Sequence, residues 1–188
     1  MHKTPAQKER TRPDWLKIKL NTSGDFMRTR DLMRSQDLNT VCEEARCPNI
    51  YECWGRQTAT IMILGDTCTR SCGFCSVKTG KPLGVDSEEP YRTAEAIKTM
   101  NLRHVVITSV DRDDLKEDYG AETWAKTIEI IRRLTPECTI EVLTPDFRNY
   151  VPAYEKVFHA SPDIFSHNIE CVQRISKKVR PQSNWKRS

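Results

Sequence analysis

The stretch "ATIMILGDTCTRSCGFCSV", residues 59–77, joins a short apolar run to three closely spaced cysteines. The run over residues 59–66 is rich in isoleucine and ends at Gly-Asp, a pattern that predicts a buried strand followed by a loop. Cys68, Cys72 and Cys75 fall in that loop with the spacing C-x3-C-x2-C. Three thiols at the end of one strand point to metal or redox chemistry.

Strand and helix patterns alternate along the rest of the chain. Further apolar runs predict strands over residues 104–110, 139–145 and 163–170. Helical periodicity predicts helices over residues 87–102, 121–136 and 151–162. This alternation predicts an α/β fold, a partial (βα) barrel of about four βα units, with a parallel sheet covered on both faces.

Polar segments follow each predicted strand. Besides the cysteine loop, they are "TSVDRDDL" at 108–115, "TPDF" at 144–147 and "HNIE" at 167–170. Loops at the carboxyl ends of the strands in a βα barrel meet at one rim, and active sites form there. We therefore expect these four segments to converge on a single site.

Composition narrows the class of protein. The chain has 30 Lys and Arg against 26 Asp and Glu, and the net charge of +4 is spread along it, which does not indicate a nucleic-acid partner. No apolar run is long enough for a membrane span. Residues 1–20 lack the core of a secretory signal, and we expect them to be a flexible lead-in. We expect a cytoplasmic protein, in which eight cysteines favour metal or redox chemistry over disulfides.

A second cysteine triplet precedes the first. Cys42, Cys47 and Cys53 are spaced C-x4-C-x5-C within "VCEEARCPNIYECWG", residues 41–55. A structural zinc site takes four protein ligands, whereas a 4Fe–4S cluster held by three thiolates keeps one iron open. The residues alone leave zinc and iron open, although two clusters account for two triplets more simply. Cys138 and Cys171 stand alone and are expected to be small buried side chains.

The cysteine loop resembles that of the radical S-adenosylmethionine (SAM) superfamily. Together with the upstream triplet, it makes the chain similar to the lipoyl synthase family, from about Thr40 to the last residues. The similar segments are "TVCEEARCPNIYECWG" (40–55), "ATIMILGDTCTRSCGFCSVKTGKP" (59–82), "HVVITSVDRDDL" (104–115), "IEVLTPDF" (140–147), "HNIE" (167–170) and "KKVRPQ" (177–182).

The resemblance implies two 4Fe–4S clusters and SAM as cofactors. Cys68, Cys72 and Cys75 would hold the cluster that binds SAM and cleaves it to a 5′-deoxyadenosyl radical. Cys42, Cys47 and Cys53 would hold an auxiliary cluster that is consumed as the sulfur donor. The residues implied to line the SAM pocket are Asp66, Thr108, Ser109, Asp111, Asn168 and Glu170.

The resemblance also implies the reaction and the partners. A radical SAM sulfurtransferase of this family inserts two sulfur atoms into an octanoyl chain on a lysine of a lipoyl-carrier domain. The carriers would be E2 subunits of 2-oxoacid dehydrogenases and the H protein of glycine cleavage, and ferredoxin or flavodoxin would supply electrons. Residues 1–56 would be an N-terminal extension with the auxiliary-cluster motif, and residues 57–188 the radical SAM core.

The chain departs from the family pattern in three places. Tyr119 and an extra residue stand where a Gly-Gly turn is expected, and Cys171 and Gln173 stand where Thr and Pro are usual. Family members are longer, and a serine near their C-terminus ligates the auxiliary cluster, so we expect an incomplete core that does not complete lipoyl formation alone. The alternatives are another radical SAM sulfur-insertion enzyme and a non-catalytic iron–sulfur or zinc-binding fragment.

Overall fold

The structure is a computed structural model that describes residue 13 and residues 24–55 and 58–188. Five strands form the main sheet in the order β1-β2-β5-β6-β7. They are β1 (Asn39–Thr40), β2 (Thr60–Ile63), β5 (His104–Ser109), β6 (Thr139–Leu143) and β7 (Ile164–Ser166). β2, β5, β6 and β7 run parallel, which confirms the predicted α/β class, and β1 is antiparallel to β2.

A helix follows each parallel strand, as the alternation predicted. The helices are α4 (Glu89–Met100), α5 (Ala121–Leu134), α6 (Val151–His159) and α7 (Gln173–Val179). Pro90 lies in the first turn of α4, and Asn101 ends that helix in a left-handed conformation at φ 52°. Trp124, Ile128 and Ile131 on α5 recur at helical spacing and are fully buried, so this apolar face of the helix packs on the core.

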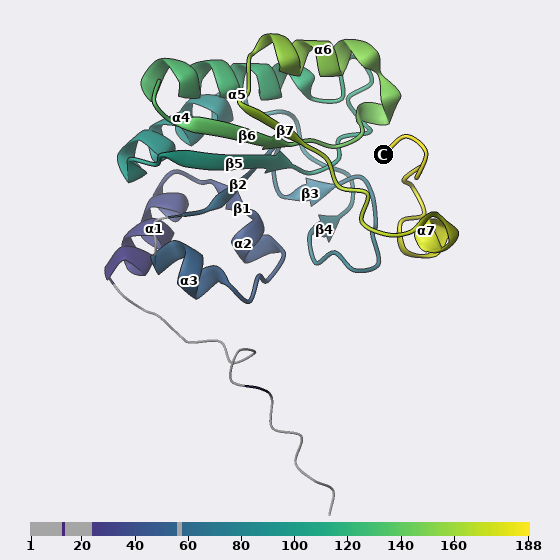
Figure 1. Cartoon of the computed structure of the whole chain (residues 1–188), viewed down its shortest axis with the longest axis horizontal. Helices are drawn as coiled ribbons and strands as arrows, with labels where there is room; N and C mark the ends of the chain where they lie inside the picture. Colours follow the sequence, from purple (N-terminus) through teal and green to yellow (C-terminus); the bar gives the residue numbers. More distant parts are fainter. Residues whose placement is uncertain (1–12, 14–23, 56–57) are drawn as a thin grey trace, which may run out of the picture.

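The helices α4, α5 and α6 pack side by side along one face of the sheet (Figure 1). Successive right-handed crossovers between neighbouring strands place their helices on the same face. Val105, Ile107 and Val142 are buried beneath these helices. On the opposite face Met62 of β2 is buried, whereas Val106 of β5 and Leu143 of β6 are only half-buried. Among the described residues, the expected cover of the second face is therefore found over β2 and is incomplete over β5 and β6.

The described residues of the N-terminal extension dock against the β1–β2 edge. They form α1 (Gly24–Ser35), α2 (Val41–Glu44) and α3 (Ile50–Gly55), which the sequence did not predict individually. Phe26 of α1 stacks on Tyr51 of α3 with ring centroids 5.3 Å apart, and Trp54 is 1% exposed. The proposed boundary between extension and core falls at residues 56–57, and the expected lead-in at residues 1–20; both lie outside the described residues, apart from residue 13.

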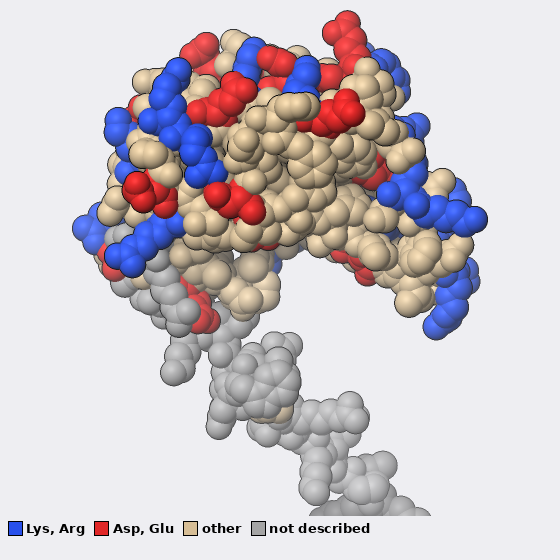
Figure 2. Space-filling view, turned by 45° about the horizontal axis from the view of Figure 1, so that its top comes forward, with Lys and Arg blue, Asp and Glu red and all other residues tan. Residues whose placement is uncertain are grey.

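The sheet is open in the part of the chain that the structure describes, with β1 and β7 at its two edges. Two short parallel strands, β3 (Thr67–Cys68) and β4 (Lys78–Thr79), and one 3-10 turn, η2 (Phe147–Asn149), complete the elements. Figure 2 shows Lys and Arg interspersed with Asp and Glu over much of the surface, with basic side chains gathered toward α7. None of the described helices is long and apolar enough to cross a membrane.

Candidate functional site

The cysteine loop lies between β2 and α4, where the sequence placed it. β3 and β4 pair at its two ends, and Gly80 N donates to Cys68 O at 3.0 Å. Cys75 N donates to Cys72 O at 3.0 Å, so the last two cysteines share one turn. Cys68 and Cys72 are half-buried and Cys75 is exposed. The loop thus presents its thiols in order, from the protein interior to the surface.

The thiols lie close enough to influence one another. Burial raises the pKa of Cys68 to about 11, and the neighbouring Cys72 adds to this. Burial likewise raises the pKa of Cys72, with a further contribution from Cys75. Metal binding must therefore displace protons from these thiols, as it does wherever thiolates are the ligands.

The donor chemistry of the loop fits an iron–sulfur cluster or zinc, both of which take thiolates. Within the described ranges, no three side chains of His, Cys, Asp or Glu are gathered into a group that would hold a metal ion. The assignment of a metal site to this loop therefore rests on its three thiols and on their position after β2.

Three of the four segments expected to converge line one cavity. The carboxyl ends of β5, β6 and β7 surround this strand-end cavity, which has a volume of about 120 Å³, whereas the cysteine loop does not line it. Of the six residues proposed for a SAM pocket, five line it: Thr108, Ser109, Asp111, Asn168 and Glu170. Thr144, Asp146, His167 and Arg180 line it as well, and the sequence did not assign them.

Buried polar atoms at this cavity have no protein partner among the described residues. They include Thr144 Oγ1, His167 Nε2 and Arg180 Nε. His167 Nδ1 lies 2.8 Å from the carbonyl oxygen of Thr144, which can only accept, so Nδ1 carries the proton and Nε2 is an acceptor in the neutral ring. Because buried polar atoms in proteins nearly always find partners, these atoms fit a polar ligand in the cavity.

Asp66 does not join the other five residues. Its side chain accepts a hydrogen bond from Thr67 Oγ1 at 2.7 Å, which lowers its pKa, and lies 3.6 Å from Lys78 Nζ. It lines a separate cavity of about 320 Å³ beside α4. The backbone turns at Leu64 and Gly65, both with positive φ, and this turn sends Asp66 away from the strand-end cavity.

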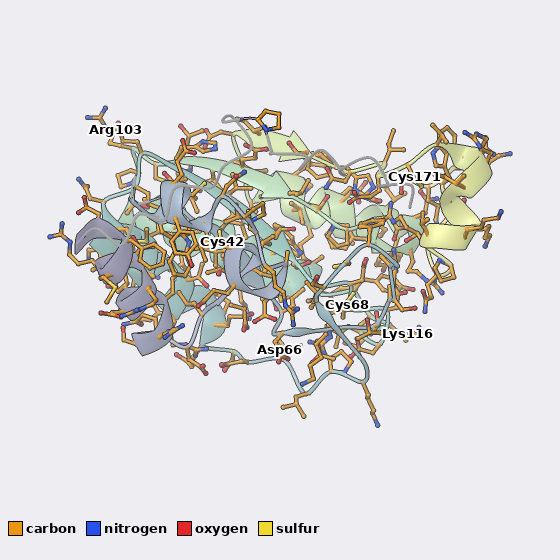
Figure 3. The ribbon with its side chains drawn as sticks, turned by 90° about the horizontal axis from the view of Figure 1, so that it is seen from below. Cys42, Asp66, Cys68, Arg103, Lys116 and Cys171 are labelled. Atoms are coloured by element: carbon orange, nitrogen blue, oxygen red, sulfur yellow. The ribbon has the colours of Figure 1, made fainter. Side chains whose placement is uncertain are left out.

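The second triplet belongs to a different part of the fold. Cys42 lies on α2 and is buried, Cys53 lies on α3, and Cys47 connects them with its N–H donating to Cys42 O at 3.1 Å. Figure 3 shows Cys42 and Cys68 at separate places on the molecule. Cys138 is 2% exposed, as expected of a lone cysteine, whereas Cys171 is half-buried near α7.

The last residue of α7 and the segment after it form hydrogen bonds with the cysteine loop. Gly73 N donates to Val179 O at 2.7 Å, and Ser71 N donates to Gln182 Oε1 at 3.1 Å. Arg180, between them, lowers the pKa of Cys72 against the raising effect of burial. The sequence placed these residues in a segment of resemblance, "KKVRPQ", but gave no sign that it would meet a loop more than a hundred positions earlier.

Two family profiles match the chain. The family profile of the Radical SAM superfamily matches residues 62–188, and that of the N-terminal domain of lipoyl synthase of the Radical SAM family matches residues 2–47. The chain is 55% identical over 177 residues to the lipoyl synthase of Symbiobacterium thermophilum, covering 94% of this chain and 55% of that protein. It is 54% identical over 187 residues to the lipoyl synthase of Rubrobacter xylanophilus, covering 98% of this chain and 58% of that protein.

A third relative, the lipoyl synthase of Shouchella clausii, is 51% identical over 187 residues, which are 99% of this chain and 60% of that protein. The chain therefore spans somewhat more than half the length of the curated relatives that it matches. The match to the superfamily profile covers more than half of this chain.

Proposed function

Because the chain belongs to the radical SAM superfamily, we propose that Cys68, Cys72 and Cys75 hold a 4Fe–4S cluster and that the strand-end cavity forms part of a SAM site. Three thiolates would leave one iron free for SAM. When bound, the cluster and SAM together supply a carbon-centred radical, which can remove hydrogen from an unactivated carbon where general acids and bases cannot.

The proposal rests on the short distance between the cysteine loop and the strand-end cavity. Cys68 Sγ lies 4.0 Å from Asp111 Oδ2, and Asp111 also lines the cavity. Arg180 likewise belongs to the cavity and acts on Cys72. An iron held by this loop would thus face the cavity in which polar atoms lack partners.

The cavity residues match the groups of SAM. Arg180 would bind its carboxylate, because a guanidinium is the side chain best matched to a carboxylate. Asp111 and Glu170 would accept hydrogen bonds from its amino group and ribose hydroxyls. His167 Nε2, fixed as an acceptor by the contact of Nδ1 with Thr144 O, would accept one from the adenine amino group.

The similarity to lipoyl synthases extends the proposal to the whole reaction. Cys42, Cys47 and Cys53 would hold the auxiliary cluster that donates two sulfur atoms to an octanoyl chain. The substrate would be an octanoylated lipoyl-carrier domain, from a 2-oxoacid dehydrogenase E2 subunit or a glycine cleavage H protein. A cytoplasmic ferredoxin or flavodoxin would supply electrons, and the parallel sheet would be part of a radical SAM barrel.

The test uses the chain reconstituted anaerobically with iron and sulfide, in a variant with Cys42, Cys47 and Cys53 changed to Ala. This variant keeps only the loop of residues 68–75 as a cluster site. We expect SAM to alter the electron paramagnetic resonance spectrum of the reduced protein and to be cleaved to 5′-deoxyadenosine. An unchanged spectrum would contradict the assignment, and zinc in place of iron in the metal analysis would favour a non-catalytic metal-binding role.

A further inference from the structure

Arg70 lies between Cys68 and Cys72, yet its side chain is 1% exposed. An arginine in a loop ordinarily keeps its charged head in water. Here the guanidinium points into the protein and meets three carboxylates. Its Nε and Nη2 donate to the two carboxylate oxygens of Asp113 at 2.9 and 2.8 Å, and Nη2 also donates to Asp146 Oδ1 at 2.6 Å. Nη1 lies 3.2 Å from Asp111 Oδ1.

These carboxylates belong to the ends of two neighbouring strands. Asp111 and Asp113 follow β5, and Asp146 follows β6. Thr69 strengthens the connection, since its backbone N and its Oγ1 donate to Asp111 O at 3.0 and 2.8 Å. The cysteine loop is therefore joined to both strand ends through buried, charge-assisted hydrogen bonds, which fix geometry more strongly than neutral ones.

Arg70 is the positive charge nearest to the carboxylates of Asp111, Asp113 and Asp146 among the described residues. The guanidinium of Arg70 is always charged, and its hydrogen bonds to Asp113 and Asp146 compensate the cost of burying that charge. Arg148 and Arg187 approach Asp113 and Asp146 only at 3.6 and 3.7 Å. Without Arg70, the three acidic side chains would keep only the charges of Arg148, Arg180 and Arg187 as compensation. The loop would then keep the hydrogen bonds of Thr69 to the end of β5 and would lose its contact with Asp146.

We propose that Arg70 is a positioning residue that holds Cys68 and Cys72 against the carboxyl ends of β5 and β6. Asp111 contacts Arg70 and also lines the strand-end cavity. By this contact Arg70 would orient the cluster so that its iron without a thiolate ligand faces the cavity. The part that concerns iron and SAM rests on the proposed function, whereas the placement of the thiols does not.

Arg112 offers a matched control. Its side chain is 2% exposed, and its Nε and Nη2 donate to Asp114 at 2.9 and 2.8 Å. Its remaining hydrogen bonds go to the carbonyl oxygens of Leu64 and Leu83. The change Arg112→Gln removes a buried guanidinium from the segment that also carries Asp111 and Asp113, and its partners lie outside residues 68–75.

The first arm of the test uses the iron-free chain. Alkylation of individual cysteines is followed by mass spectrometry in the parent and in the Arg70→Gln and Arg112→Gln variants. Cys68 should react about fivefold faster or more in Arg70→Gln, because a loop released from the strand ends exposes its buried thiol, and thiol reactivity rises with exposure. Arg112→Gln should leave the Cys68 rate at the parent value, even where its melting temperature falls.

The second arm uses the reconstituted chain and follows its reduced spectrum during a SAM titration. We expect Arg70→Gln to bind SAM about tenfold more weakly and Arg112→Gln to stay within about twofold of the parent, since loss of an outer-shell partner of a metal site typically costs 10–100-fold. Arg70→Lys should restore part of the affinity, because lysine keeps the charge but not the two parallel hydrogen bonds.

Equal Cys68 alkylation in the parent and Arg70→Gln would overturn the proposal, as would equal changes in Arg70→Gln and Arg112→Gln. A parent chain that does not respond to SAM would refute the proposed function instead, and the alkylation arm would still decide the role of Arg70. If Arg70→Gln does not fold, Asp113→Asn replaces it in both arms. Faster alkylation of Cys68 in Asp113→Asn then supports the proposal, and an unchanged rate overturns it.

Discussion

At the scale of single residues, the side chain of Glu89 closes the turn that leads from β2 to the cysteine loop. Its carboxylate accepts hydrogen bonds from Leu64 N at 2.7 Å and from Gly65 N at 3.1 Å. Both of these residues have positive φ, so their N–H groups cannot join the sheet ladder beyond β2. Burial raises the pKa of Glu89, although the two N–H groups oppose this. The carboxylate of Glu89 thus accepts the hydrogen bonds of two backbone N–H groups that no backbone carbonyl accepts in the described structure.

We expect Glu89→Ala to destabilise the chain by about 1–3 kcal/mol, because buried donors left without a partner cost their full desolvation. Glu89→Gln should lose less, since its amide oxygen still accepts one of the two hydrogen bonds. Urea unfolding of the iron-free chain measures both variants. The exposed neighbour Glu88, changed to Gln, is the control and should leave the midpoint unchanged; an equal loss at both positions would show that the turn does not depend on Glu89.

At the scale of elements, Arg132 joins α5 to the segments on either side of β6. Its Nη2 lies 2.6 Å from Asp163 Oδ2, and its Nη1 donates to Cys138 O at 3.1 Å. Asp163 Oδ2 also accepts from Ile140 N at 2.7 Å. One carboxylate before β7 therefore connects a helix and a strand.

The pKa of Asp163 is lowered, first by the hydrogen bond from Arg132 and then by that from Ile140 N. A carboxyl whose folded pKa lies below its unfolded value of 3.8 contributes stability above that value and loses it as the pH falls through the folded pKa. We expect Asp163→Asn to cost about 0.5–1 kcal/mol at neutral pH, because the pair is largely exposed. In urea titrations the difference from the parent should stay constant down to about pH 4 and shrink below it; a difference that grows with acidity would contradict this account.

The elements also show how far sequence patterns reach. The four parallel strands and the helices α4, α5 and α6 follow from runs of apolar residues and from helical periodicity, because these patterns report local burial. β1, β3 and β4 have two residues each, too few for any periodicity, and exist only through their pairing partners. The α1–α3 layer depends on aromatic contacts such as that of Phe26 with Tyr51, which no local pattern specifies.

The candidate site also contains residues that the sequence predicts and residues that it does not. Its cysteines and five strand-end residues were predicted, because thiol spacing and topology are visible in the sequence. Arg70 was missed, since a basic residue in a polar loop is ordinarily solvated and its burial depends on Asp113 and Asp146 from distant segments. Asp66 lines a different cavity from the other five residues, because the left-handed turn at Leu64 and Gly65 redirects the chain just before it.

At the scale of the whole molecule, the two cysteine triplets are supported by separate sets of contacts. Residues 42–53 lie on α2 and α3, which dock through β1 on β2 and through α3 on α1. The loop of residues 68–75 is held by the β3–β4 pair, by Arg70 and by the segment after α7. The contacts named here, all between described residues, do not involve the thiols of the other triplet, so we expect each site to tolerate the loss of the other's cysteines.

This separation predicts two independent clusters. Changing Cys68, Cys72 and Cys75 together to Ala should leave about half of the iron and sulfide of the parent after anaerobic reconstitution, because each 4Fe–4S cluster carries the same number of irons. Changing Cys42, Cys47 and Cys53 should leave the other half, and Cys138→Ala, a buried lone cysteine outside both triplets, should leave all of it. Loss of all iron in either triple variant would mean that the triplets share ligands in one site. Full retention of iron in both would mean that it is bound elsewhere.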